Sequence, residues 1–359
     1  MYKNIKNIDK IVYGTGSFDQ LEDIIKPKRL LNNKFFVFLV DDFFKGKYLE
    51  KRIPSQNEDI VEFIYCGKDE PKTGQIDNLR DKILASKGLP SGVVGIGGGS
   101  IMDLAKALSV MFTQEGSSVL YQGLNLAKNP GIFHVGVPTI SGTGAECSTT
   151  AVLTGPTKKL GIKCEYTPFD QIVLDPELTL TVPKNQWFYT GMDSYIHCIE
   201  SESGRLYNTF SKAYGDQSLV LCREVFLGDN SGQTMENAEK LMVASLFGGL
   251  SLSYSEVGIC HALSYGLSYV LGTRHGIANC IAFNVLEDYY PQGVKEFREM
   301  INKHHIDLPI NMSKDWTDEQ LIKMAEISYA LSHMWDHALG VNWKEKVSIE
   351  MIIGLFKRM

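Results

Sequence analysis

Short apolar runs and longer amphipathic stretches alternate through the first half of the chain. The run at residues 35–40 is apolar at every position, as expected for a strand that is buried on both faces of a sheet. Strand-like runs cover residues 10–13, 35–40, 59–66, 92–96 and 132–137, and helical patterns cover residues 73–87 and 101–111. The alternation predicts a Rossmann-type parallel sheet with helices on both faces, with Thr73 as the cap of one helix.

Beyond residue 183 the pattern changes to long helical periods with few strand signals. The helical stretches cover residues 187–203, 209–226, 236–256 and 318–338. A chain of 359 residues is long enough for two separate cores. We therefore expect an α/β domain over residues 1–183 and an all-α domain over residues 184–359.

Composition and charge narrow the class of protein. Hydrophobic residues make up 44% of the chain and charged residues 22%, which is ordinary for a globular enzyme. The formal charge of −6 argues against a nucleic-acid-binding surface, and no apolar run approaches the roughly 20 residues of a membrane helix. The chain starts without the apolar core of a secretory signal, and its 7 cysteines form no Cys-x-x-Cys pair. We expect a cytoplasmic protein with reduced thiols and with no nucleic-acid or membrane partner.

Asp193 and His197 lie four residues apart in a helical stretch, so both side chains project from one face. A carboxylate and an imidazole side by side form half of the ligand set of an Fe²⁺ or Zn²⁺ ion. The other half can come from downstream, where His261 lies in a helical pattern and His275 follows a glycine-containing turn. The four side chains together suit one divalent metal, although an Asp-x-x-x-His pair alone is more often a salt-bridged helix face.

Two turns rich in glycine and hydroxyl side chains follow predicted strands. Gly97, Gly98 and Gly99 precede Ser100 at the start of a helix, where a pyrophosphate can meet backbone N–H groups without a Cβ in the way. Residues 138–146 form the second turn, Pro-Thr-Ile-Ser-Gly-Thr-Gly-Ala-Glu. The first turn departs from Gly-x-Gly-x-x-Gly at its last position, and a lone glycine cluster indicates only a tight turn. Two such turns at the ends of parallel strands indicate a dinucleotide across the edge of the sheet.

Asp41 follows the apolar run at residues 35–40, where the ribose of a bound adenosine would lie. A carboxylate there accepts hydrogen bonds from ribose hydroxyls and repels a 2′-phosphate, which favours NAD over NADP. Asp42 could take the same role, and both could instead be solvated turn residues.

Five motifs occur in a single order, at residues 97–106, 138–146, 175–180, 191–200 and 258–276. Together they resemble the iron-containing, or group III, metal-dependent alcohol dehydrogenases. The resemblance implies a dehydroquinate-synthase-like fold, with the active site in a cleft between a dinucleotide-binding domain and a helical metal-binding domain. It also implies NAD-linked oxidation of a primary alcohol to an aldehyde, or the reverse, with the substrate hydroxyl bound to the metal.

The resemblance assigns roles to particular residues. The family's metal ligands fall on Asp193, His197, His261 and His275. Its cofactor contacts fall on Asp41, Gly97, Gly98, Gly99, Ser100, Asp103, Thr139, Thr143 and Lys159. Glu200 is expected to support the metal site from outside the ligand set, and Lys106 to hold the helix at the glycine turn.

Two positions depart from the family's pattern. Tyr265 replaces a histidine that relays a proton in many members, and it is expected either to hydrogen-bond the substrate or to pack as an aromatic residue. Arg274 stands where a proline is common, and its guanidinium can bind a carboxylate or phosphate of the substrate or make a surface salt bridge. The whole chain is similar to members that oxidise the C8 hydroxyl of the sugar acid 3-deoxy-manno-octulosonate (Kdo).

Several alternatives stay open from the sequence. Within the same fold, the chain could be a glycerol-phosphate dehydrogenase or a dehydroquinate-synthase-like enzyme. Outside the class, it could be a metal hydrolase or a non-catalytic metal-binding protein. Cys198 and Cys260, which flank the proposed ligands, are alternative metal donors. If the chain is an alcohol dehydrogenase, we expect a small-molecule alcohol or sugar-acid substrate and a homodimer.

Overall fold

The computed structural model describes residues 5–32, 35–66 and 70–359, and the chain divides into two compact units. The first unit comprises residues 1–140 and 145–179, and the second comprises residues 141–144 and 180–359. The helical unit thus starts slightly before the expected boundary at residue 183. It also takes in a four-residue segment from the turn that follows a strand of the first unit.

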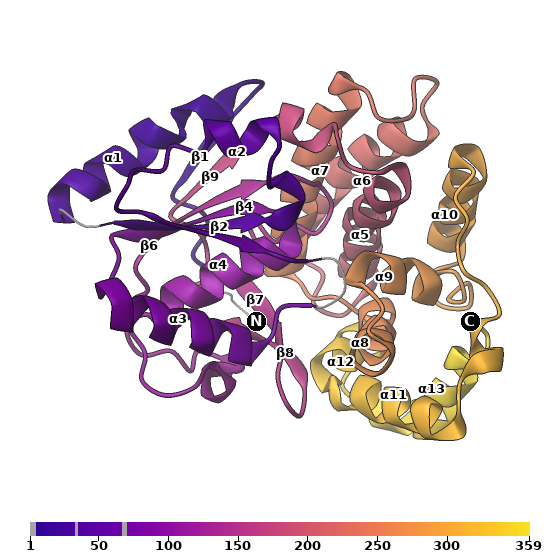
Figure 1. Cartoon of the computed structure of the whole chain (residues 1–359). Coiled ribbons are helices and arrows are strands. Elements are labelled where there is room, and N and C mark those ends of the chain that lie inside the picture. Colours follow the sequence, from indigo (N-terminus) through magenta and orange to yellow (C-terminus); the bar gives the residue numbers. More distant parts are fainter. Residues whose placement is uncertain (1–4, 33–34, 67–69) are drawn as a thin grey trace. The chain divides into compact units, whose positions relative to one another are not determined.

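The first unit is built on a six-stranded sheet in the order β1-β9-β6-β4-β2-β3. Every neighbouring pair of strands runs parallel, which confirms the predicted type of sheet (Figure 1). The strands are β1 (Lys10–Tyr13), β2 (Phe36–Asp41), β3 (Ile60–Ile64), β4 (Gly92–Gly97), β6 (Phe133–Pro138) and β9 (Gln171–Leu174). Because the carboxyl ends of parallel strands share one edge, the ends of β2, β4 and β6 lie next to one another.

Strand β2 is buried on both faces, as its uninterrupted apolar run predicts. Phe36, Phe38 and Val40 point to one face, where they join a core with Phe18 and Leu21. Helices cover both faces of the sheet, with α1 and α2 on one side and α3 and α4 on the other (Figure 1). These helices are α1 (Leu21–Asn32), α2 (Tyr48–Arg52), α3 (Thr73–Lys87) and α4 (Gly99–Met111).

The structure corrects two expectations in the first unit. Thr73 is not the cap of α3, because Lys72 occupies that position and Thr73 is the first helical residue. A second, three-stranded sheet of β5 (Gly123–Leu124), β8 (Lys159–Lys163) and β7 (Thr150–Thr154) was not expected. Its strands are short and mix polar with apolar residues, so they lack the apolar runs that mark the central sheet.

The second unit is helical among its described residues, as expected. Its α-helices are α5 (Lys184–Ser203), α6 (Thr209–Leu227), α7 (Met235–Tyr254), α8 (Ile259–Leu271), α9 (His275–Phe283), α10 (Pro291–His304), α11 (Asp318–Ala330), α12 (Ser332–Leu339) and α13 (Ile349–Phe356). The helix expected over residues 318–338 is broken at Leu331, whose ψ of 55° is not helical. The break accompanies a hydrogen bond from the indole of Trp335 to the Ser328 carbonyl, 2.7 Å long.

Within the described ranges, no single helix has both the length and the apolar character needed to cross a membrane. Helices α7 and α8 meet that test of length and composition only as a pair, across a bend of 104°.

Candidate metal centre

Helix α5 presents Asp193 and His197 from successive turns of one face. Gly191, two residues before Asp193, lies against the ring of Phe226, where an added Cβ would approach the ring to 2.6 Å. The hydroxyl of Ser194 donates to the carbonyl of Gly142 at 2.7 Å, which ties the segment at 141–144 to α5. Close packing on both sides therefore fixes the turn of α5 that carries the carboxylate.

Helices α8 and α9 supply the other two imidazoles. His261 is the third residue of α8, and His275 is the first residue of α9. Gly272 ends α8 in the left-handed conformation, with φ of 68°, so the chain can turn sharply into α9. Gly276 lies against the backbone of α5, where an added Cβ would come within 3.0 Å of the Tyr189 carbonyl oxygen. The start of α9 can therefore pack directly on α5.

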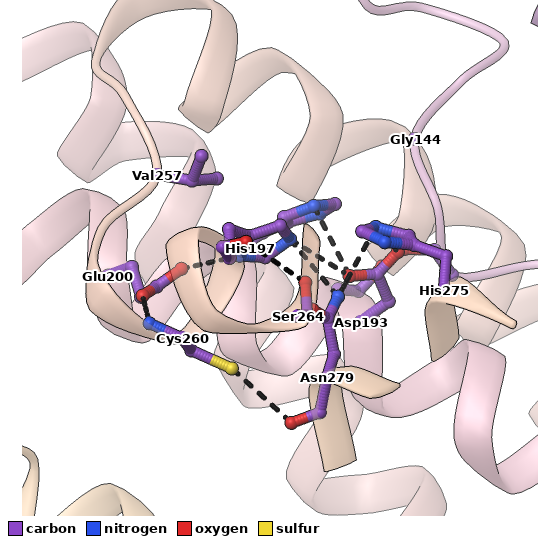
Figure 2. A network of polar contacts seen from close by, with 12 residues as sticks. Gly144, Asp193, His197, Glu200, Val257, Cys260, Ser264, His275 and Asn279 are labelled. Atoms are coloured by element: carbon purple, nitrogen blue, oxygen red, sulfur yellow. Dashed lines mark hydrogen bonds and ion pairs between the residues drawn. The ribbon is translucent and has the colours of Figure 1, made fainter. Parts of the chain in front are cut away.

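The four side chains converge, with one potential ligand atom from each lying within 4.8 Å of the others (Figure 2). Nε2 of His197 and Nε2 of His261 are each 3.3 Å from Oδ1 of Asp193, and Nε2 of His275 is 3.4 Å from Oδ2. Ligands at 2.0–2.1 Å from a tetrahedral ion are separated by about 3.4 Å, so these separations match a divalent metal. Oδ2 of Asp193 is buried without a hydrogen-bond partner among the described residues, which leaves it available to a cation.

Burial and charge set the protonation of this cluster. Burial alone would raise the pKa of Asp193, but the neighbouring imidazoles lower it below its ordinary value. Burial lowers the pKa of His197 to about 4, so its ring is neutral and can donate a lone pair at neutral pH. Burial opposes protonation of His261 as well, but the carboxylates of Glu200 and Asp193 raise its pKa to about 9. A metal ion bound at Nε2 would displace that proton.

Glu200 lies one turn after His197 and does not face the centre of the cluster. Its Oε2 is 2.5 Å from Nδ1 of His261, and its Oε1 accepts a hydrogen bond of 2.6 Å from the Cys260 backbone N–H (Figure 2). A carboxylate on Nδ1 holds the imidazole with Nε2 toward the ligand cluster, as in carboxylate–histidine–metal arrangements. This is the placement expected of a residue that supports the site from outside the ligand set.

Asn279 is a member of the cluster that the sequence reasoning missed. It lies four residues after His275 on the same face of α9, and it is fully buried. Its Nδ2 is 2.6 Å from Oδ1 of Asp193, 3.2 Å from Nε2 of His261 and 3.3 Å from Nε2 of His275. The spacing of four residues from a ligand histidine is a signal that could have identified it.

The cysteines are not part of the cluster. The thiol of Cys260 donates to the backbone carbonyl of Asn279 at 3.3 Å, and the neighbours of Cys198 include the Ser218 hydroxyl. Burial raises the pKa of both thiols, which disfavours the thiolate form that binds metals. Among the described residues, the group suited to a metal consists of Asp193 and three histidines.

Tyr265 and Arg274 lie near one end of the cluster. Tyr265 is one turn after His261 on α8, and its ring stands edge-on to the His275 ring at 6.0 Å between centroids. Arg274 is the N-cap of α9, is exposed, and donates to the side-chain oxygen of Gln186 at 3.3 Å. The His275 side chain is 28% exposed, whereas the other three ligand side chains are almost fully buried. The His275 side is therefore the most exposed side of the cluster.

In the first unit, three of the expected cofactor residues meet at the carboxyl edge of the sheet. Gly97 ends β4, and a Cβ on it would come within 3.2 Å of the Asp41 Cβ at the end of β2. The backbone N–H of Thr139, just after β6, donates to the carbonyl of Gly97 at 2.9 Å. Asp41 also caps a short 3₁₀ helix by accepting from the Phe43 backbone N–H at 3.1 Å, whereas Asp42 begins that helix.

Helix α4 starts at Gly99, with Gly98 at the cap position, so Ser100 lies in its first turn. A Cβ on Gly97 would clash with Ile101 at 2.5 Å, which shows how closely the helix starts against the strand. Gly98, at the cap position, makes no side-chain hydrogen bond to the first turn of the helix. The backbone N–H groups of its first turn are therefore suited to an anion.

Two lysines of the first unit form buried ion pairs. Nζ of Lys106 is fully buried, lies 3.3 Å from Asp103 and donates to the carbonyl of Thr150 at 2.5 Å. Lys106 thus ties α4 to β7, and these contacts are not the expected ones with the glycine turn. Burial raises the pKa of Asp103 to about 6. Lys159, at the start of β8, is paired with Glu70.

Thr143 belongs to the segment 141–144 that packs within the helical unit. The N–H of Gly144 in this segment donates to the hydroxyl of Ser245 at 3.2 Å, and its Cα region fits closely against Gly249. A side chain at Gly142 would collide with the Thr190 carbonyl at 1.7 Å. The glycines of the turn therefore allow it to lie directly against α5 and α7.

Comparison with known proteins agrees with this geometry. The model of the family described as iron-containing alcohol dehydrogenase matches residues 9–176. A model of the C-terminal region of the Fe-containing alcohol dehydrogenase family matches residues 187–332. The two matches together cover both structural units.

Individual relatives span much of the chain. The sulfoacetaldehyde reductase of Bilophila wadsworthia is 30% identical over 296 residues, which is 79% of this chain and 74% of that relative. The 4-hydroxybutyrate dehydrogenase of Clostridium kluyveri is 26% identical over 82% of this chain and 79% of that relative. Other relatives are named for uncharged alcohols such as methanol and 1-propanol. The sulfoacetaldehyde reductase structure from Bifidobacterium kashiwanohense, in complex with NAD⁺, aligns with a TM-score of 0.80 at 19% identity, covering 99% of this chain and 98% of that one.

Proposed function

Since the chain belongs to the iron-containing alcohol dehydrogenase family, we propose that it interconverts an anionic primary alcohol and the corresponding aldehyde. It is an NAD-linked oxidoreductase that acts on CH–OH groups and uses a divalent metal. In the oxidation, the hydroxyl loses its proton and the carbon transfers hydride to NAD⁺, which gives aldehyde, NADH and a proton. The family assignment favours this reaction over a metal hydrolase, a cyclase or a glycerol-phosphate dehydrogenase.

The observation that carries the proposal is the convergence of Asp193, His197, His261 and His275. These residues would hold the ion, and a metal bound there supplies Lewis-acid chemistry that lowers the pKa of a coordinated hydroxyl. Asp193 contributes the negative charge of the site, and the neutral His197 ring contributes a lone pair. The partial exposure of His275 leaves a path for the substrate hydroxyl.

For NAD, we assign the pyrophosphate to the first turn of α4, at Gly97, Gly98, Gly99 and Ser100. Backbone N–H groups and the helix dipole favour the negative charge there. Asp41 is assigned to the adenosine ribose, because it lies beside Gly97 at the end of the neighbouring strand. Asp103, Thr139, Thr143 and Lys159 complete the proposed set of cofactor contacts.

For the substrate, we assign Arg274 to an anionic group and Tyr265 to a hydrogen bond with the reacting hydroxyl. Arg274 is exposed immediately before His275, and its contact with Gln186 leaves other guanidinium N–H groups available. Two relatives are named for substrates that carry a sulfonate or a carboxylate. The specific substrate we propose is Kdo, whose C8 hydroxyl is a primary alcohol and whose carboxylate is the anion.

A substrate panel tests this proposal. The enzyme is loaded with Fe²⁺ or with Zn²⁺, and NADH absorbance is followed with Kdo, 4-hydroxybutyrate, 1,2-propanediol and 1-butanol, and in the reverse direction with sulfoacetaldehyde. We expect kcat/KM for an anionic substrate to exceed that for butanol at least tenfold. Equal or better turnover of butanol would remove the anionic-substrate proposal, and no NADH change with any substrate would contradict the oxidoreductase.

An Asp/His₃ site accommodates either Fe²⁺ or Zn²⁺. Comparing the activities of the Fe²⁺-loaded and Zn²⁺-loaded enzyme in the same panel distinguishes the two metals.

We also propose a cytoplasmic homodimer. All seven cysteines are free thiols, as expected in a reducing compartment. Light scattering of the purified protein gives the mass of the assembly.

A further inference from the structure

Asn279 occupies a special position among the residues around the metal centre. It is 0% exposed and lies on α9, between the ligand of that helix and the ligands of α5 and α8. Its side chain contacts three of the four ligands, Asp193, His261 and His275 (Figure 2). Its backbone carbonyl accepts from the Cys260 thiol on α8. Side chain and backbone together connect all three helices that carry ligands.

The orientation of the Asn279 amide follows from its strongest contact. A carboxylate oxygen accepts hydrogen bonds, and of the two ends of an amide only the nitrogen donates them. The group 2.6 Å from Oδ1 of Asp193 must therefore be the amide nitrogen. The amide oxygen of Asn279 then points elsewhere, and it has no hydrogen-bond partner among the described residues.

This contact makes the two oxygens of Asp193 different. Oδ1 is occupied by the Asn279 amide, whereas Oδ2 is buried without a hydrogen-bond partner among the described residues. A carboxylate held at one oxygen cannot rotate freely, so its other oxygen is presented in a fixed direction. The same amide nitrogen lies between Nε2 of His261 and Nε2 of His275, at 3.2 and 3.3 Å. Asn279 therefore lies against both rings at the nitrogens that face the cluster.

We propose that Asn279 is a positioning residue of the metal centre, which orients Asp193 for a divalent ion and packs against the imidazoles of His261 and His275. The inference rests on the metal centre of the proposed function and adds a residue outside its ligand set. Losing such a supporting contact typically weakens metal affinity by about 10- to 100-fold. The cost arises because the ion must then order side chains that the wild-type protein already holds in place.

Co²⁺ binding to the full-length protein, freed of metal by chelation, tests this role. Affinity is measured by competition with a chelator, the ligand field by visible absorption, and the fold of the metal-free protein by its melting temperature. The variants are Asn279→Leu, which keeps the branch at Cγ but loses the donor, and Asn279→Ser, whose hydroxyl is too short to replace the amide. Asn284→Leu and Asn284→Ser are matched controls, since Asn284 follows the same helix and contacts Arg298 instead of the ligands.

We expect both Asn279 variants to bind Co²⁺ about 10- to 100-fold more weakly, with altered visible bands, while the Asn284 variants match the wild type. A folded Asn279 variant with wild-type affinity and bands would overturn the inference, as would a loss of thermal stability without any change in the bands. If Asn279→Leu does not fold, the result for Asn279→Ser decides. Failure of the wild type to bind Co²⁺ would instead refute the metal centre itself.

Discussion

Oε2 of Glu200 lies 2.5 Å from Nδ1 of His261, and both side chains are almost fully buried. Burial alone would raise the pKa of Glu200, but its contact with His261 lowers it, so the carboxylate is ionised. An ionised carboxylate on Nδ1 requires Nδ1 to carry a proton. The lone pair of a neutral His261 ring is then on Nε2, the nitrogen that faces Asp193.

Replacing Glu200 tests this relationship. Glu200→Gln retains an acceptor for Nδ1 but loses the charge, and Glu200→Leu loses both and leaves the buried Cys260 N–H without its acceptor. We expect metal affinity to fall by up to about 100-fold, more for Leu than for Gln. Chelator competition measures the change. Glu202→Gln on the same helix is the control, and an equal loss in that variant would show that the effect is not specific to His261.

The preference of variants for NAD or NADP shows which of Asp41 and Asp42 contacts the adenosine ribose. Asp41→Asn removes the charge that repels a 2′-phosphate, so we expect KM for NADP to fall and KM for NAD to rise, each severalfold. Asp42→Asn should leave both KM values near those of the wild type, because Asp41 is the residue beside Gly97. Steady-state kinetics with both cofactors decides between them. A change of preference in the Asp42 variant alone would move the ribose contact to that residue.

The proposed role of Arg274 in substrate binding is tested by comparing anionic with uncharged substrates. Arg274→Ala removes a charge-assisted hydrogen bond, so we expect kcat/KM for an anionic alcohol to fall by about tenfold or more. Turnover of 1-butanol should change less than twofold, because it offers no anion. Arg298→Ala is the matched control, since Arg298 is another exposed arginine, on α10. An equal loss with both substrates would assign Arg274 to the structure of α9 and not to substrate binding.

We expect Lys106 to stabilise the folded state of the first unit. Lys106→Met leaves Asp103 and the Thr150 carbonyl without their buried cation, which should lower the free energy of unfolding by on the order of 3–5 kcal/mol. Lys82→Met removes an exposed lysine paired with Glu62 and should cost less than about 1 kcal/mol. Urea titrations of the two variants give the comparison. Equal stabilities would show that Lys106 does not hold α4 to β7.

The central parallel sheet could be predicted from the sequence because its strands are buried on both faces. The apolar run at residues 35–40 leaves little alternative to a buried strand, and it forms β2 one residue further along. The hairpin of β7 and β8 carries no such run, since β7 alternates buried with half-buried residues and has a threonine at each end, and β8 has a lysine at each end. Its position depends on contacts such as that of Lys106 with Thr150, which join residues 44 positions apart.

The metal ligands could be proposed from the sequence because helical spacing links Asp193 to His197. His261 and His275 could be named from the sequence only as candidates, and the family resemblance then assigned them as ligands, since nothing local joins them to α5. Asn279 was missed because its spacing of four residues from His275 becomes a signal only once His275 is taken as a ligand. Its 2.6 Å contact with Asp193 joins residues 86 positions apart.

The most direct test of the metal centre is the metal content of His261→Ala, measured by elemental analysis of purified protein and compared with His333→Ala, which removes an exposed histidine of α12. We predict that His261→Ala remains folded but loses its bound metal and its NAD-linked activity together, while His333→Ala retains both. Full metal occupancy in folded His261→Ala would contradict the account.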